Sequence, residues 1–396
     1  MQRNLIGGQM DPGQDHDAAR RLAPIQRAEV FVIQADFVTP YRVTEGLLVN
    51  TRAIMLRLTD ADGVEGWGEA NPSKTFTGES IEDAVEALRD LLLPAVLTAP
   101  HPEPGLVDAH LDAALDRQFC AKGAISMALW DILGKRLGAP VSALLGGALR
   151  RQIAVLWPLS SGTADEDMAV IDTRAAQGFS HFMLKMGSAP VAEDIARVAA
   201  LEKRYGRSIR LIADANQGWG REDALTFVRG VAGSALEFIE QPLVRDDVAG
   251  MAALAAESAV PISADEAVIG LPQAAQLARA DAARVFSLKS SKNGGPLRAQ
   301  KIAALGEGFG IQCYMNSMHE FGITQMASFQ HATTIRNLFD FGHAFMSTLR
   351  LAEDPTDFST LIDKAVITLP DRPGMGLQVD ADHVAALAQG RFELAR

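Results

Sequence analysis

Ionisable side chains follow short apolar runs at regular intervals in the second half of the chain. The six residues are Lys185, Asp214, Glu240, Asp265, Lys289 and Glu320. Their separations are 29, 26, 25, 24 and 31 residues, each close to the length of one strand plus one helix. If each residue closes a strand of a parallel barrel, all six lie around one rim, where barrel enzymes have their active sites.

The three consecutive carboxylates of this set predict a metal site. Any one of them alone could be a surface turn residue, but Asp214, Glu240 and Asp265 on neighbouring strand ends would repel each other without a cation. Hard oxygen ligands with no Cys or His nearby favour Mg²⁺ over Zn²⁺. We therefore predict one Mg²⁺ bound by these three side chains.

The two lysines come from the strands before and after the acidic trio, so they would approach from opposite sides of a barrel mouth. This arrangement suits removal of a proton next to a carboxylate, because Mg²⁺ can take up the charge that develops on the carboxylate oxygens. A lysine that is partly desolvated beside a divalent cation has a lowered pKa. Lys185 and Lys289 are therefore predicted to act as general bases or acids near neutral pH.

A β–α rhythm from residue 152 onward supplies the elements that would position these groups. Strand-like runs alternate with Ala- and Leu-rich helical patterns such as 191–205 and 222–231, which indicates a parallel sheet. Eight strands over this length favour one closed α/β barrel over an open sheet. The predicted strands are 153–159, 181–186, 209–214, 236–240, 261–265, 285–289, 312–316 and 338–341.

The first part of the chain has a different pattern. Three short apolar runs, 28–33, 51–58 and 64–69, with a turn signal at Asp62-Gly63, predict an antiparallel meander. Helical patterns follow at 81–96, 106–116 and 123–137, the last of which ends at Gly138 with Pro140 beyond it. Residues 1–25 are predicted to be a flexible tail.

Composition excludes several other classes of protein. The 396 residues are 48% hydrophobic and 22% charged, with a net charge of −12. This acidity argues against nucleic-acid and anionic-membrane partners. The two cysteines form no CxxC pair, and the chain shows no signal peptide or apolar stretch long enough to span a membrane. We expect a soluble cytoplasmic protein with a sizeable core.

Motifs along residues 26–380 resemble those of the enolase superfamily, in particular its muconate-lactonizing-enzyme-like subgroup. Their order and spacing together are more specific than any one of them. They are Gly123–Asp131 with Leu144–Gly147, Leu184–Gly187, Ala213–Asn216, Ile239–Pro242, Ala264–Glu266, Lys289 with Asn293–Gly295, and Pro373–Gly376.

The resemblance implies a (β/α)7β TIM-type barrel under an α+β capping domain that is built from the N- and C-terminal segments. The boundaries would be a capping domain at 26–150, a catalytic barrel at 151–345, and a segment 346–396 that returns to the cap. It also implies Mg²⁺ on the acidic trio, acid/base roles for the two lysines, and a homo-oligomer. Near the seventh strand, the family's expected glutamate is Glu320, which we count with the two lysines as a catalytic candidate.

Two departures from the family pattern concern the reaction. The common Lys-x-Lys is Met183-Leu184-Lys185 here, so the cation that would lower the pKa of the base is missing. Dipeptide epimerases carry Asp-x-Asp on the last strand, whereas Asp340-Phe341-Gly342 keeps only the first aspartate. A dipeptide ammonium would therefore lack a partner.

The resemblance places two substrate-closing loops near residues 39–46 and 76–79. Arg42, Lys74 and Thr77 are the candidate substrate residues, with the two cations able to hold a second anionic group; solvated loop charges are the alternative. His319 is more simply a packed or solvent-facing histidine. The predicted reaction is isomerisation of a small carboxylic acid, by racemisation, epimerisation or cycloisomerisation through an enediolate. The alternatives are a hydroxy-acid dehydratase and a non-catalytic binding protein.

Overall fold

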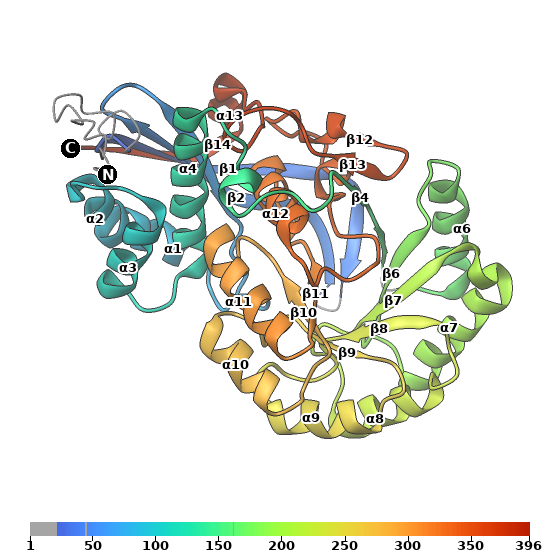
Figure 1. Cartoon of the computed structure of the whole chain (residues 1–396). Coiled ribbons are helices and arrows are strands. Elements are labelled where there is room, and N and C mark those ends of the chain that lie inside the picture. The colour runs from blue at the N-terminus through green and yellow to red at the C-terminus, as the bar shows by residue number, and fades with distance from the viewer. Residues whose placement is uncertain (1–21, 44–45, 161) are drawn as a thin grey trace, which may run out of the picture.

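The computed structural model describes residues 22–43, 46–160 and 162–396 (Figure 1). Residues 1–21, most of the predicted tail, lie outside the described residues. The other four residues of that segment are described: Leu22 is 3% exposed and Ile25 is fully buried. The first strand begins at Ile25.

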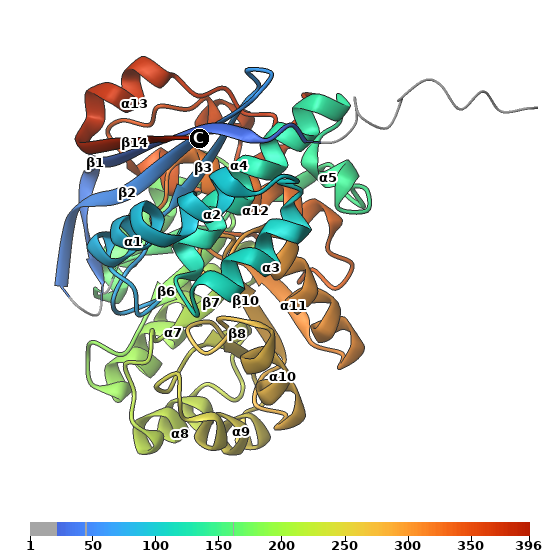
Figure 2. The same cartoon turned by 90° about the vertical axis from the view of Figure 1, so that its left-hand side faces the viewer.

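A four-stranded antiparallel sheet forms the cap, in the order β14-β1-β2-β3. Its strands are β1 (Ile25–Val43), β2 (Gly46–Asp60), β3 (Glu65–Ala70) and β14 (Ala388–Ala395). The meander is therefore present, and β14 comes from the other end of the chain to pair with β1 from Arg27↔Ala395 to Ile33↔Ala388. Figure 2 shows this sheet beside the cap helices.

The cap helices are α1 (Ile81–Ala87), the π-turn η2 (Leu88–Leu92), α2 (Leu93–Thr98), α3 (Pro104–Ala114) and α4 (Phe119–Leu137). The helix predicted at 81–96 is thus interrupted, because Pro94 has no N–H to donate to the preceding turn. Strand β3 approaches α4 closely: a Cβ on Gly68 would lie 1.8 Å from the carbonyl oxygen of Ala124. Only glycine permits this contact.

Seven parallel strands form the curled barrel sheet, in the order β11-β10-β9-β8-β7-β6-β5. They are β5 (Trp157–Leu159), β6 (His181–Lys185), β7 (Arg210–Asp214), β8 (Leu236–Glu240), β9 (Ile262–Ala264), β10 (Val285–Leu288) and β11 (Gln312–Met315). Helices surround them in an arc (Figure 1): α6 (Ala164–Ala175), α7 (Val191–Tyr205), α8 (Arg221–Gly230), α9 (Val248–Glu257), α10 (Leu271–Arg279) and α11 (Pro296–Gly308).

Residues 337–343 close the barrel without forming a full strand. Isolated parallel bridges join Cys313 to Leu338 and Val155 to His343. The predicted eighth strand is therefore reduced to these bridges. The predicted strand 153–159 is divided. In a separate sheet, β4 (Gln152–Ala154) pairs with β13 (Val366–Thr368), which pairs in turn with β12 (Ile362–Asp363), and only β5 joins the barrel.

Two buried carboxylates fasten the cap to the rest of the molecule. Glu69 of β3 accepts hydrogen bonds from the backbone N–H groups of Phe321 and Thr324, at 2.8 and 2.9 Å, where α12 (Gly322–Thr334) begins. Burial is the main cause that raises the pKa of Glu69 to about 8. Asp131 of α4 accepts from Trp67 N at 3.2 Å and Met375 N at 2.8 Å.

The remaining elements are α5 (Val141–Leu144), α13 (Ala381–Leu387), and the 3₁₀ turns η3 (Gly206–Ser208), η4 (Ser347–Arg350) and η5 (Phe358–Leu361). Within the described residues, no helix combines the length and the apolar character needed to cross a membrane.

Candidate active site

The strand ends bring five of the six predicted residues together. Lys185, Asp214 and Glu240 are the last residues of β6, β7 and β8, and the register pairs Lys185 with Asp214 and Asp214 with Glu240. Asp265 follows β9 directly, and Lys289 follows β10. The β–α spacing of the sequence thus becomes a row of ionisable groups along the carboxyl edge of a parallel sheet.

Each lysine forms a buried ion pair with one member of the acidic trio. Lys185 Nζ lies 2.5 Å from Asp214 Oδ2 and also donates to Asn216 Oδ1 at 2.8 Å. Lys289 Nζ lies 2.6 Å from Asp265 Oδ2. The exposed fractions of the side chains are 11% for Lys185, 4% for Lys289 and at most 1% for the two aspartates. The pairs are therefore shielded from water.

Glu240 carries charge that the protein itself does not balance. Its Oε1 accepts hydrogen bonds from Ser287 Oγ and, at 2.7 Å, from Asn316 Nδ2. Its Oε2 is buried and has no hydrogen-bond partner among the described residues. Burial first, and then the charges of Asp214 and Asp265, raise the pKa of Glu240 well above its usual value. A cation at this position would offset the repulsion between the three carboxylates and give Glu240 Oε2 a partner.

In the described parts of the chain, no three His, Cys, Asp or Glu side chains are already arranged around a metal position. The ion pairs give the reason, since ammonium groups occupy oxygens of Asp214 and Asp265. The residues nevertheless fit a hard divalent cation, because the donor set is buried and made of carboxylate oxygens and Glu240 Oε2 is unpartnered.

The pKa values of the two lysines differ from the sequence prediction, which was a lowered pKa for both. Burial favours the neutral amine of Lys185, but the neighbouring Asp214 outweighs it and the pKa stands above its usual value. Lys289 is raised in the same way: burial opposes the charge, and Asp265 with Glu266 and Glu240 overcomes it. The neighbouring carboxylates therefore favour the protonated form of both lysines.

Sequence reasoning missed Lys292, the fully buried neighbour of the site. Its Nζ donates to Asp265 Oδ1 at 2.6 Å and to the carbonyl oxygens of Asp265 and Ser287 at 2.5 and 3.1 Å. Burial lowers its pKa. The spacing Lys289-Ser-Ser-Lys292 was the available signal, since one turn after β10 returns the chain toward Asp265.

Glu320 takes part in neither of the two lysine–aspartate ion pairs. Its carboxylate accepts hydrogen bonds from Ser317 Oγ at 2.9 Å, from Met318 N, and from Gln325 Nε2 at 3.0 Å. It is fully buried, and burial raises its pKa. These contacts hold the loop after β11 in shape, which places Glu320 as a support of this loop.

The three candidate substrate residues differ in their exposure to solvent. Arg42 and Lys74 are exposed, and Arg42 lines a surface depression with Glu166 and Asp167. Thr77 is buried, and its hydroxyl donates to the carbonyl oxygen of Ser73 at 2.8 Å.

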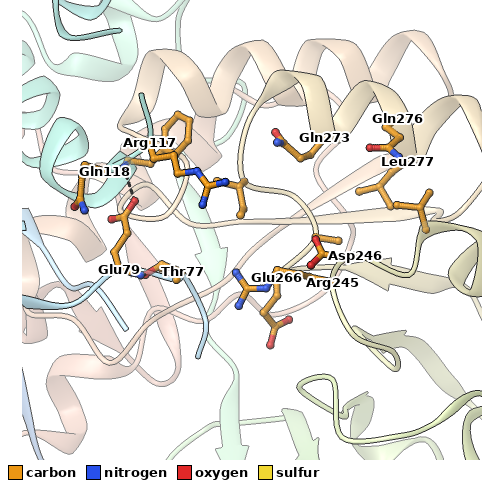
Figure 3. Close-up of a pocket in the computed structure, with 15 residues that line it drawn as sticks. Thr77, Glu79, Arg117, Gln118, Arg245, Asp246, Glu266, Gln273, Gln276 and Leu277 are labelled. Atoms are coloured by element: carbon orange, nitrogen blue, oxygen red, sulfur yellow. Dashed lines mark hydrogen bonds between the residues drawn. The ribbon is translucent and has the colours of Figure 1, made fainter. Parts of the chain in front are cut away.

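Next to Thr77, Phe76 lies over Lys289, with 5.7 Å from Nζ to the ring centroid. Figure 3 shows Thr77 and Glu79 at a cavity that Arg245 and Glu266 also line. Lys74 and Thr77 therefore share the loop that brings Phe76 over Lys289, and of these two only Thr77 is buried.

The structure combines a capped barrel with carboxylates and lysines at the strand ends. Comparison with known proteins identifies the class of enzyme that has this arrangement. Residues 27–146 match the "Mandelate racemase / muconate lactonizing enzyme, N-terminal domain" model, and residues 167–383 match "Enolase C-terminal domain-like". The chain belongs to the mandelate racemase/muconate lactonizing enzyme family of the enolase superfamily, in its muconate-lactonizing-enzyme-like subgroup. It is an isomerase of this superfamily.

Two curated relatives are each 32% identical to the chain. L-Ala-D/L-Glu epimerase of Bacillus subtilis aligns over 89% of this chain and 96% of its own length. Muconate cycloisomerase 1 of Pseudomonas putida aligns over 92% and 98%.

Two solved structures have the same fold. The N-succinyl Arg/Lys racemase from Bacillus cereus has a TM-score of 0.89 at 26% identity, covering 94% of this chain and all of its own. The muconate lactonizing enzyme from Pseudomonas fluorescens with muconolactone has a TM-score of 0.88 at 32% identity, covering 93% and all of its own. Enzymes of this subgroup are metal-dependent, with Mg²⁺ typical.

Proposed function

We propose that this enzyme isomerises a small carboxylic acid by moving the proton α to its carboxylate, with Lys185 and Lys289 as the acid/base pair. The observation that carries the proposal is the placement of the two lysines. They stand at the ends of β6 and β10, with three strands between them, and each is ion-paired to one of the carboxylates in the row. Groups on opposite sides of a barrel mouth can reach opposite faces of one α-carbon.

The proton chemistry of the chain follows from these positions. In racemisation or epimerisation, one Nζ takes the α-proton and the other Nζ delivers a proton to the opposite face. In cycloisomerisation, one lysine carries all the proton transfers and the other supplies positive charge. Phe76 over Lys289 excludes water from this amine. Glu320 holds the loop after β11 as a positioning residue.

Asp214, Glu240 and Asp265 are the residues that would hold a divalent cation, Mg²⁺ by our proposal. When bound, it would neutralise the carboxylates that now raise the pKa of both lysines, and would supply Lewis-acid stabilisation to the enediolate. Asn316 supports this assignment, because its amide donates to both Glu240 and Asp265, at 2.7 and 3.3 Å.

Several properties stay predictions. The substrate is a small carboxylate, and Arg42, Lys74 and Thr77 are the loop residues first assigned to it. The cytoplasm as location, a homo-oligomeric state, and the boundaries 26–150, 151–345 and 346–396 follow from the sequence and the family resemblance. The β14–β1 pairing supports the last boundary, because it returns the C-terminal segment to the cap.

The test is α-proton exchange followed by ¹H NMR in D₂O, across a library of small carboxylic acids with Mg²⁺ or with EDTA. We expect at least one acid to lose its α-proton signal with Mg²⁺ and to keep it with EDTA. The matched control is the Lys185→Ala/Lys289→Ala double variant. Exchange that persists at the wild-type rate in that variant would refute the two-lysine proposal.

A further inference from the structure

Each carboxylate of the proposed metal site has one oxygen that a donor of the chain already binds. Asp214 Oδ1 accepts a hydrogen bond from the backbone N–H of Asn216 at 2.9 Å. Asn216 has a positive φ of 44°, and the turn that this conformation makes aims its N–H back at the aspartate. Asp265 Oδ1 accepts from Lys292 Nζ at 2.6 Å. One oxygen of each aspartate is therefore committed within the protein.

Glu240 is held in the same way. Its Oε1 accepts hydrogen bonds from Ser287 Oγ and Asn316 Nδ2, and its Oε2 has no partner among the described residues. Glu240 and Ser287 are fully buried, and Asn316 is 5% exposed. Water therefore has little access to replace these donors on Oε1.

The second oxygens of the two aspartates face the proposed acid/base lysines. Lys185 Nζ binds Asp214 Oδ2, and Lys289 Nζ binds Asp265 Oδ2. An ammonium group has three N–H donors. Among the described residues, Lys289 uses one of them on an oxygen acceptor and Lys185 uses two. Both lysines must reach a substrate to act, so their two carboxylate oxygens are the ones that a metal can take over.

Lys292 is a different kind of partner, because its ammonium group is saturated. Its side chain is fully buried, and Nζ donates to Asp265 Oδ1 and to the carbonyl oxygens of Asp265 and Ser287. These three acceptors match its three N–H donors. The turn that carries it is fixed by a 2.9 Å hydrogen bond from Asn293 N to the carbonyl oxygen of Lys289. Lys292 thus has no free donor with which to serve a substrate.

We propose that Lys292 is a specificity-determining residue that keeps Asp265 Oδ1 from the metal and so favours Mg²⁺ over Ca²⁺. Ca²⁺ takes about six to eight oxygen ligands and often uses both oxygens of a carboxylate, whereas Mg²⁺ requires a near-octahedral shell. One oxygen from each of three carboxylates fills about half of an octahedral shell and leaves the rest for water and substrate. A larger ion would lack the ligands that bidentate carboxylates supply. This inference rests on the metal ligands of the proposed function.

The positive charge of Lys292 has a second effect, which has a different signature. A buried cation beside a metal ligand weakens the binding of all divalent ions almost equally, because their charges are the same. Such an effect changes the affinities for Mg²⁺ and Ca²⁺ together and leaves their ratio unchanged. The ratio of the two affinities therefore reports the blocked oxygen rather than the charge.

Metal titrations of the whole protein test the inference without a substrate. After metals are removed with EDTA and the chelator is dialysed away, Mg²⁺ or Ca²⁺ is titrated by calorimetry into wild type and into Lys292→Met. We expect wild type to bind Mg²⁺ more tightly than Ca²⁺. Lys292→Met should lower the Mg²⁺-to-Ca²⁺ affinity ratio about 10-fold or more, because Asp265 can then bind Ca²⁺ through both oxygens.

Lys122→Met is the matched control. Lys122 is also a buried lysine, 1% exposed, and it donates to a carboxylate oxygen of Asp112 at 2.8 Å and to the carbonyl oxygen of Leu115 at 2.6 Å, but it lies in the cap. This variant should keep the wild-type ratio. Lys292→Met with both affinities raised together and an unchanged ratio would assign Lys292 a purely electrostatic role and overturn the inference. Wild type that binds Ca²⁺ as tightly as Mg²⁺ would overturn it as well.

A second variant decides the matter if Lys292→Met does not fold. Ser287→Ala combined with Asn316→Ala frees Glu240 Oε1 and should also lower the Mg²⁺-to-Ca²⁺ ratio. A wild-type ratio in this double variant would count against the inference, since the same blocking applies to Glu240.

This inference and the proposed function fail in different ways. A ratio that falls as expected, in a protein that exchanges no α-proton of any acid in the library, would keep the role of Lys292 and refute the proposed reaction. Mg²⁺-dependent α-exchange with a ratio indifferent to Lys292 would keep the reaction and refute the selectivity. Wild type that binds no Mg²⁺ would refute the assigned metal ligands and this inference with them.

Discussion

Glu240 is buried beside two other carboxylates, so replacing it should affect metal binding and folding in different ways. The Glu240→Gln variant should lose Mg²⁺ binding but keep its fold. Glu240→Gln keeps the size of the side chain and the Oε1 acceptor for Ser287 and Asn316, but removes a buried negative charge. In the metal-free wild type, the pKa of Glu240 is raised above its unfolded value, so the free energy of unfolding falls as pH rises from about 4.5 through the folded pKa. The metal-free variant should lose this contribution and be at least as stable as wild type at pH 8.

Mg²⁺ binding should raise both the free energy of unfolding and the Tm of the wild-type protein. At a hundredfold excess of Mg²⁺ over its Kd, binding contributes about 2.7 kcal/mol to the stability of wild type. Unfolding entropy of about 2.1 cal/mol/K per residue gives about 0.8 kcal/mol/K for 396 residues that unfold together. Mg²⁺ should therefore raise the wild-type Tm by about 3 °C, and should not raise that of Glu240→Gln.

Differential scanning calorimetry with EDTA and with Mg²⁺ measures both effects. Glu266→Gln is the control, because Glu266 is equally buried, has an unpartnered Oε2 among the described residues, and has a pKa raised to about 7 by burial, Asp265 and Asp214. It should keep the Mg²⁺ shift. A Glu240→Gln protein with the full shift and an unchanged Kd, or loss of the shift in Glu266→Gln alone, would refute the assigned ligand set.

Three further predictions concern the two lysines, the pH dependence of stability that Glu69 causes, and the close contact at Gly68. If the reaction is racemisation or epimerisation, Lys185→Ala should stop α-exchange of one stereoisomer and Lys289→Ala that of the other, each with turnover lowered about 10²–10⁴-fold, as NMR in D₂O can measure. In a cycloisomerisation the two variants should instead differ without this mirror pattern, and near-wild-type exchange in both would contradict the two-lysine mechanism. Since the pKa of Glu69 is about 8 in the folded state and near 4.5 in the unfolded one, the free energy of unfolding should fall between pH 4.5 and 8. Urea titrations of Glu69→Gln should show a smaller decline, and an identical one would refute the assignment. Gly68→Ala places a Cβ 1.8 Å from Ala124 O and should cost about 1–3 kcal/mol. The control is Gly308→Ala at the end of α11, where the added Cβ meets no neighbour and the backbone has no positive φ, and it should show no loss of stability.

Sequence reasoning predicted the row of strand-end residues because its signal is periodic. The β–α units have similar lengths, so the spacing alone assigns Lys185, Asp214, Glu240, Asp265 and Lys289 to one rim. The meander and helix α7 (Val191–Tyr205) were predictable for a similar reason, since strand alternation and helical amphipathicity are local.

Features that depend on contacts between distant residues could not be predicted in this way. The lysine pKa values follow from which oxygens face Nζ, and these are set by rotamers. Barrel closure by isolated bridges at Leu338 and His343 leaves no strand-length pattern. Which oxygen of Asp265 is already bound also depends on the fold, because the turn after β10 brings Lys292 Nζ onto Oδ1.

The pairing of β14 with β1 has a consequence for biosynthesis. During translation, β1, β2 and β3 emerge first, but the strand that covers the free edge of β1 is made only after the whole barrel. Until then that edge presents unpaired N–H and C=O groups, a surface open to pairing with another chain. The edge of β1 is therefore open to such pairing from the synthesis of the hairpin until β14 is made. Joining the two strands by circular permutation, at the contact between Arg396 N and Gln26 O, would supply the covering strand from the start.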